Sequence, residues 1–110
     1  MARFVKGDII VIPFPFSDLS GSKKRPAFVP ADLSGDDIIL CQITSQFKKD
    51  EYSIQLTSSD LESGSSVKLS YIRPNHIFTA DKNIIIKKVA SVKEDIHQQV
   101  VDTLIDIINP

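Results

Sequence analysis

The sequence predicts a mainly β fold, a small β-barrel or sandwich followed by a C-terminal amphipathic helix. Short runs of β-branched and apolar residues recur along most of the chain, and turn-forming Ser, Asp, Gly and Pro residues separate them. The last stretch changes to a period of three to four residues, which is typical of an amphipathic helix. At 110 residues, the chain has the length of a single domain, residues 1–110.

The first strands are apolar runs that end at turn residues. Residues 8–14 (DIIVIPF) suit a buried strand, and Pro13 and Pro15 indicate that it ends there or lies at an edge. After the loop SDLSGSKK, residues 26–33 resume a strand, and the turn SGDD predicts a hairpin into residues 38–44. Three further strands are expected at residues 52–57, 65–72 and 83–89.

A helix is expected over about residues 92–108. The segment SVKE fits a capping box, in which the Ser91 hydroxyl and the Glu94 carboxylate satisfy opposing free amides. Ile96, Val100 and Leu104 then recur at helical spacing and predict one apolar face that packs on the strands. His97 falls on this helix and is expected at the surface.

Composition and charge exclude several kinds of protein. The net charge of −1 and the pI near 6.1 mean that any basic site is a local patch. Cys41 is the only cysteine, so a disulfide scaffold is excluded and its thiol is expected to pack. No apolar run approaches the roughly 20 residues of a membrane span. The protein is therefore expected in the cytoplasm, away from membranes, and no metal-ligand spacing or cofactor motif is present.

A triple cation, Lys23, Lys24 and Arg25, stands directly before Pro26. On pattern alone, a solvated turn explains it as well as an anion site does. As an anion site, the planar Arg25 guanidinium at the start of a strand would suit two phosphate oxygens at once. The two lysines would attract phosphates without selecting a sequence.

Two more polar stretches follow the same pattern. In CQITSQFKK a strand ends at Thr44, Ser45 and Gln46, whose hydroxyl and amide groups can bond a phosphate or a base edge. In KLSYIRP the polar residues are Lys68, Ser70 and Arg73. A polar strand end explains the first stretch and a lone amphipathic strand explains the second, so both alternatives stay open.

Taken in order, these stretches resemble the MazF/PemK-like toxins of type II toxin–antitoxin systems. GDIIVIPFPFSDLSGSKKRPAFV resembles the family's N-terminal signature, which is a Gly-Asp strand, a variable loop, then Arg-Pro and an apolar strand. ITSQ matches the second motif, and SYIRPNHIF and IIIKKVASV resemble the later strands. The resemblance spans about Gly7 to Ile108 and implies an SH3-like β-barrel that forms a homodimer.

The resemblance also implies a metal-independent, sequence-selective endoribonuclease. In such enzymes the ribose 2′-hydroxyl of single-stranded RNA attacks the adjacent phosphate, which leaves 2′,3′-cyclic phosphate and 5′-hydroxyl ends. Arg25 matches the family's catalytic arginine and Thr44 its catalytic threonine. The RNA-binding residues that it implies are Phe16, Lys23, Lys24, Ser45, Gln46, Lys68, Ser70 and Arg73. The general acid and base are not assigned, because Ser70 stands where some members carry an acidic residue.

The implied partners besides RNA are proteins. A cognate antitoxin is expected to cover the RNA groove with its C-terminal segment, and operator DNA is expected to be contacted only through that complex. Two alternatives remain. The first is a toxin of the same fold that poisons a protein such as DNA gyrase, as the related CcdB toxins do, although the end IDIINP lacks the expected aromatic tip. The second is a non-catalytic SH3-like module that binds nucleic acid or peptide.

Overall fold

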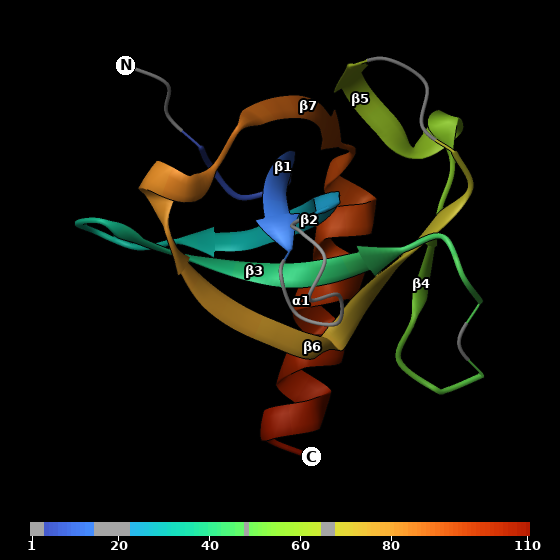
Figure 1. Ribbon diagram of the computed structural model, residues 1–110. Coiled ribbons are helices and arrows are strands. Elements are labelled where there is room, and N and C mark those ends of the chain that lie inside the picture. The colour runs from blue at the N-terminus through green and yellow to red at the C-terminus, as the bar shows by residue number, and fades with distance from the viewer. Residues whose placement is uncertain (1–3, 15–22, 48, 65–67) are drawn as a thin grey trace.

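The computed structural model describes residues 4–14, 23–47, 49–64 and 68–110, and it confirms the predicted fold class (Figure 1). Within these residues, one curved antiparallel sheet has the strand order β4-β6-β3-β2-β1-β7-β5, and a helix lies across one of its faces. The elements are β1 (Asp8–Phe14), β2 (Lys23–Asp32), β3 (Asp37–Thr44), β4 (Ile54–Leu56), β5 (Leu61–Gly64), β6 (Ser70–Asp81), β7 (Lys87–Val92) and α1 (Glu94–Ile108). Two short 3-10 helices occupy Ser58–Asp60 and Lys82–Ile84.

The strand predicted over residues 65–72 is present only from Ser70 onward; Lys68 and Leu69 precede it, and residues 65–67 lie outside the described residues. β5 ends at Gly64, and β6 begins at Ser70 and continues past Pro74 to Asp81. A proline normally ends a strand because it lacks an N–H. Here the register against β3 shifts between Arg73 and Ile77, so Pro74 falls in the bulge and no ladder bond is required of it.

Other strands also begin or end at residues that differ from the predicted ones. β2 starts at Lys23 instead of residue 26, so the triple cation belongs to a strand and not to the loop before it. The strand expected at 52–57 is confined to Ile54–Leu56. The strand expected at 83–89 starts later, at Lys87, because Lys82–Ile84 form a 3-10 turn that begins at Asp81, whose side chain accepts the Asn83 N–H.

The helix is present, but the predicted capping box is wrong. Ser91 lies in β7, and its hydroxyl donates to Asp8 Oδ1 at 3.2 Å. The N-cap residue is Lys93, whose side chain makes no capping bond. His97 is not a surface residue either, since one ring nitrogen lies 3.1 Å from the Pro30 carbonyl oxygen and the ring packs near Phe28.

Two apolar clusters fill the two faces of the sheet. Alternate side chains of each strand point to opposite faces, so Ile9 and Phe28 belong to one cluster and Ile10 and Val29 to the other. α1 completes the first cluster with its buried Ile96 and Val100, as the helical spacing predicts. Cys41 is buried in this cluster, and burial raises the pKa of its thiol to about 12, which confirms a packing role.

Asp8 joins the first strand to the last. Its carboxylate is 1% exposed and accepts hydrogen bonds from the Val5 N–H at 2.9 Å and from the Ser91 hydroxyl. Lys88 Nζ lies 3.2 Å from Asp8 Oδ1. The preceding Gly7 has a φ of +91°, a value that side-chain-bearing residues rarely adopt. The Gly-Asp pair is thus explained by backbone geometry and by a buried acceptor.

We expect Asp8→Ala to lower the free energy of unfolding by about 1–3 kcal/mol, because it removes the buried acceptor of the Val5 N–H and the Ser91 hydroxyl. Asp8→Asn should lose less, since the amide oxygen still accepts the Val5 N–H. Urea denaturation followed by circular dichroism measures both values. Asp95→Ala, on the exposed side of α1, is the matched control. Equal stability of the Asp8→Ala and control variants would contradict the structural role.

Candidate functional site

A pocket of about 300 Å³ opens where β2 and β3 part. The β2–β3 ladder reaches Ala27 and Gln42, whereas β2 stays paired with β1 as far as Lys23. The pocket's floor is the edge of the first apolar cluster, with Ile9, Ile43 and Leu56. The polar residues that line it are Lys24, Arg25, Ser45, Lys68 and Ser70. Half of the predicted site residues therefore meet in one pocket.

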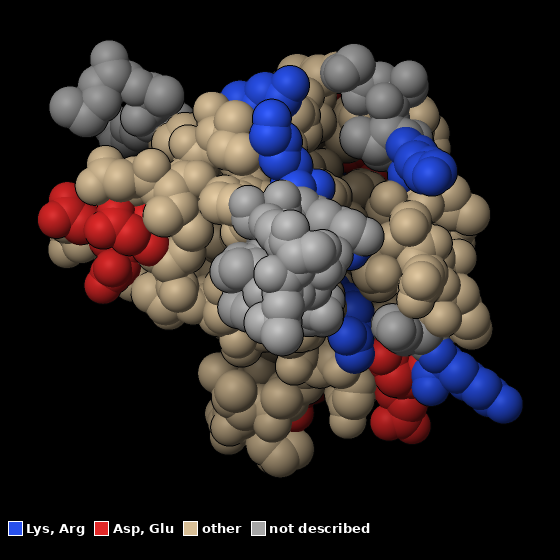
Figure 2. Space-filling view, in the orientation of Figure 1, with Lys and Arg blue, Asp and Glu red and all other residues tan. Residues whose placement is uncertain are grey.

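Cations from distant parts of the chain meet at this pocket. Lys24 and Arg25 come from β2 and Lys68 from the segment before β6, and all three side chains are exposed. Figure 2 shows Lys and Arg side chains in the middle and on the right of this face. Acidic side chains occupy its left edge over the β2–β3 hairpin and also lie beside the cations at its lower right. A local basic patch thus exists on a chain whose net charge is −1.

Thr44 lies on the opposite face of β3 from Ile43 and does not line the pocket. It pairs with Tyr71 across the β3–β6 ladder. Beyond the last β2–β3 pair, Ala27 with Gln42, the two strands part, and Arg25 and Thr44 each lie two residues further along their strand. Thr44 Oγ accepts the Gln46 N–H at 3.1 Å. Arg25 and Thr44 thus come from the two strands that part at the pocket, and only Arg25 lines it.

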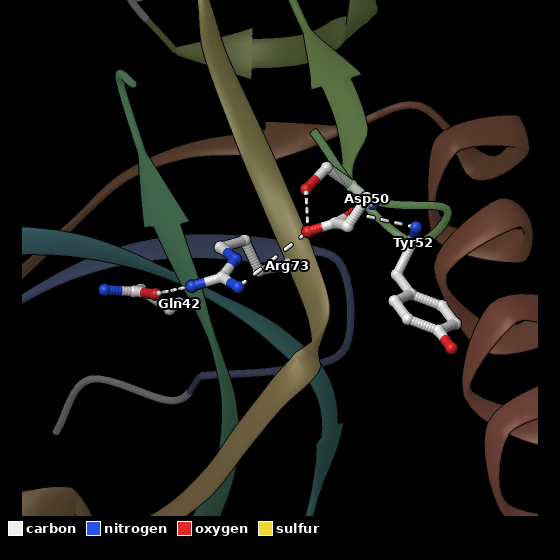
Figure 3. Close-up of polar contacts among 5 residues, drawn as sticks. Gln42, Asp50, Tyr52 and Arg73 are labelled. Atoms are coloured by element: carbon white, nitrogen blue, oxygen red, sulfur yellow. Dashed lines mark hydrogen bonds and ion pairs between the residues drawn. The ribbon is translucent and has the colours of Figure 1, made fainter. Parts of the chain in front are cut away.

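Arg73 is engaged inside the protein (Figure 3). Its Nη1 donates to Gln42 Oε1 at 3.1 Å, and its Nη2 lies 3.8 Å from Asp50 Oδ2. Its Nε is buried and has no hydrogen-bond partner among the described residues. The guanidinium therefore links β6 to β3 and to the β3–β4 connection.

Asp50 organises that connection. Its carboxylate accepts the backbone N–H groups of Tyr52 and Ser53, each at 2.8 Å (Figure 3). These two bonds, with Ser53 first, and to a smaller extent the charge of Arg73, lower the pKa of Asp50 below its ordinary value. The carboxylate that holds the turn thus stays ionised well below neutral pH.

The remaining predicted residues differ in what they can offer a ligand. Ser70 is buried and its hydroxyl donates to the Lys68 carbonyl at 2.8 Å, whereas Ser45 and Gln46 are exposed. Phe16 lies outside the described residues, and only the backbone of Lys23 is described.

Sequence reasoning missed Gln42 and Asp50 as partners of Arg73. For Gln42 the sequence contains a signal that places it near the site, because Gln42 stands two residues before Thr44 and shares its face of the strand. Asp50 had none, since no periodicity relates a turn residue to Arg73 on β6.

Within the described part of the chain, no group of three or more His, Cys, Asp or Glu residues is placed to hold a metal ion. The helix that the described residues contain is too short and too polar to cross a membrane.

Comparisons with known proteins agree with the fold. Solved structures with the same fold include a mycobacterial endoribonuclease in complex with its cognate antitoxin, with a TM-score of 0.78 at 12% identity over 98% of each chain. A MazE–MazF complex from Deinococcus radiodurans matches with a TM-score of 0.77 at 18% identity over 97% of each chain. MazF alone from that organism gives 0.75 at 18% identity over the full length of both chains.

No curated protein sequence matches at a significant level. A family model, however, matches residues 5–108, nearly the whole chain. Its description is the PemK-like, MazF-like toxin of type II toxin–antitoxin systems. The chain therefore belongs to the PemK-like, MazF-like family of type II toxins.

Proposed function

We propose that the protein is an endoribonuclease toxin that cuts single-stranded RNA without a metal ion. The observation that carries the proposal is the position of Arg25, which lines a cation-rimmed pocket where its strand parts from the strand that carries Thr44. A nuclease of this kind needs a fixed cation at the reacting phosphate and further cations along the backbone on either side. Lys24 and Lys68 on the pocket rim supply the latter.

The reaction uses the RNA's own nucleophile. The ribose 2′-oxygen forms a bond to the adjacent phosphorus, its proton leaves, and the bond from phosphorus to the 5′-oxygen breaks as that oxygen takes up a proton. The products are a 2′,3′-cyclic phosphate and a 5′-hydroxyl, and the need for a 2′-hydroxyl restricts the reaction to RNA. Negative charge accumulates on the non-bridging phosphoryl oxygens during the attack.

Arg25 is suited to stabilise that charge and not to move the protons. Its guanidinium stays protonated at any relevant pH, and it is exposed and makes no ion pair or hydrogen bond with another described residue. A planar fork can contact two phosphoryl oxygens at once. Thr44 Oγ already accepts the Gln46 N–H, which leaves its own hydroxyl proton to donate to a phosphoryl oxygen. The proton donor and acceptor remain unassigned.

The partners follow from the same site. We propose that a cognate antitoxin neutralises the protein by covering the pocket and its basic rim with a C-terminal segment, and that the toxin acts as a homodimer. Two similar structures are complexes of a toxin of this fold with its antitoxin. An acidic or carboxylate-bearing segment would suit the exposed Lys24, Arg25 and Lys68 side chains.

The test is cleavage of a long single-stranded RNA by the purified protein in the presence of EDTA. Primer extension should map discrete cuts. The new 5′ ends should accept phosphate from polynucleotide kinase without prior phosphatase treatment, as 5′-hydroxyl ends do. Uncut RNA at high concentrations of folded protein would rule out the proposal and favour a protein target or a binding module.

A further inference from the structure

Phe47 is a large aromatic side chain that the proposed reaction does not use. It follows Gln46 in the connection between β3 and β4, and it is 69% exposed. Single exposed apolar residues are ordinary on protein surfaces. The contacts of this ring and its position in the fold distinguish it.

The Phe47 ring is held against Tyr71. The ring centroids are 5.5 Å apart with an interplanar angle of 71°, an edge-to-face contact. Tyr71 in turn pairs with Thr44 across the β3–β6 ladder. The exposed ring is therefore supported by the residue that neighbours Thr44, on the side of Thr44 away from Arg25.

The backbone that carries Phe47 is also held. Gln46 N–H donates to Thr44 Oγ at the start of the connection. Asp50 closes its far end through Tyr52 and Ser53, and Arg73 joins Asp50 to the sheet (Figure 3). A ring that already packs on Tyr71 loses less conformational freedom when a ligand binds to it.

We propose that Phe47 is a stacking platform for an unpaired nucleobase next to the scissile phosphate. This inference rests on the proposed function and adds a base-binding subsite to it. A single strand held by its phosphates at Arg25 and Lys24 presents unstacked bases, and an exposed aromatic ring is the group that receives them. Every base has a π-face, so the platform contributes affinity and position along the strand but does not select a sequence.

The experiment uses the chain's lack of tryptophan. Phe47→Trp introduces a sole fluorescent indole at the platform. The probe is a short, random-sequence single-stranded RNA with 2′-O-methyl groups, which can bind but cannot be cut. We expect the probe to quench the indole fluorescence of Phe47→Trp. The matched control Ile108→Trp, at a side chain that is 78% exposed at the end of α1, should keep its fluorescence.

Affinities for a fluorescein-labelled form of the same probe complete the test. Phe47→Ala should weaken binding about tenfold, the effect of losing one base–aromatic stack, and Phe47→Tyr should bind as the wild type does. Wild-type affinity of Phe47→Ala, with cleavage intact, would overturn the platform and leave the proposed function standing. A wild type that neither binds nor cuts RNA would overturn both. A changed oligomeric state of Phe47→Ala would overturn the platform by marking the ring as a protein contact.

Discussion

Arg25→Ala should slow RNA cleavage at saturating substrate by about 100- to 1000-fold, the usual effect of removing one donor that stabilises a developing oxyanion. The fold should be unaffected, because the side chain is exposed and bonds to no other described residue. Cleavage of a long RNA, followed by primer extension and compared with growth inhibition on expression, measures the effect. Circular dichroism and a melting curve establish that the variant is folded.

Two further variants separate charge from geometry. Arg25→Lys keeps the positive charge but not the planar fork, so it should recover only part of the lost activity. Lys93→Ala removes a cation at the start of α1, outside the pocket, and should cleave at the wild-type rate. A folded Arg25→Ala protein that cuts as fast as Lys93→Ala would remove Arg25 from the reaction.

Phe28→Ala should lower the free energy of unfolding by about 3–5 kcal/mol. Phe28 is fully buried between the sheet and α1, with its ring centroid 6.0 Å from that of His97. Truncation removes a large apolar area and leaves a cavity that the paired strands cannot close. Because small domains have only about 5–15 kcal/mol of stability in total, the loss is a large share of it.

Urea denaturation followed by far-ultraviolet circular dichroism gives the value, at one fixed protein concentration because association would shift the midpoint. Phe28→Leu fills most of the space and should lose much less. Ile108→Ala removes a side chain that is 78% exposed and should stay within about 0.5 kcal/mol of the wild type. A Phe28→Ala loss no larger than that of Ile108→Ala would refute this account of the core.

Local patterns predict most of the fold. The β-branched run of β1, the hairpin turn before β3 and the spacing of Ile96 and Val100 each depend on neighbouring residues alone, and all are confirmed. The errors arise where a residue that is distant in the sequence determines the local structure. Pro74 continues a strand because it lies in a bulge of β6, where the pairing with β3 skips it. Ser91 bonds to Asp8 across the sheet instead of capping the adjacent helix.

The candidate site, like the fold, is predicted by local motifs only in part. Residue types in KKRP and ITSQ indicate an anion site, and the resemblance to the family selects Arg25 and Thr44 from them. Their catalytic roles stay predictions. What no motif contains is the parting of β2 and β3 that opens a pocket beside Arg25, or the contact between Arg73 and Asp50. Arg73 looks like a free cation in the sequence, yet two partners engage its guanidinium.

The pairing of β1 with β7 has a consequence for the protein as it is being made. Asp8 meets Ser91 across this ladder, and β5 joins the sheet only through β7. While the ribosome is still adding residues before Lys87, the early hairpins can form, but β1 keeps one open edge and β5 has no neighbour. α1, which closes the first cluster, is synthesised after the strands that it covers. The growing chain thus has β2 and its cations long before it has a complete sheet, so a stable fold forms only after β7 and α1 have been synthesised.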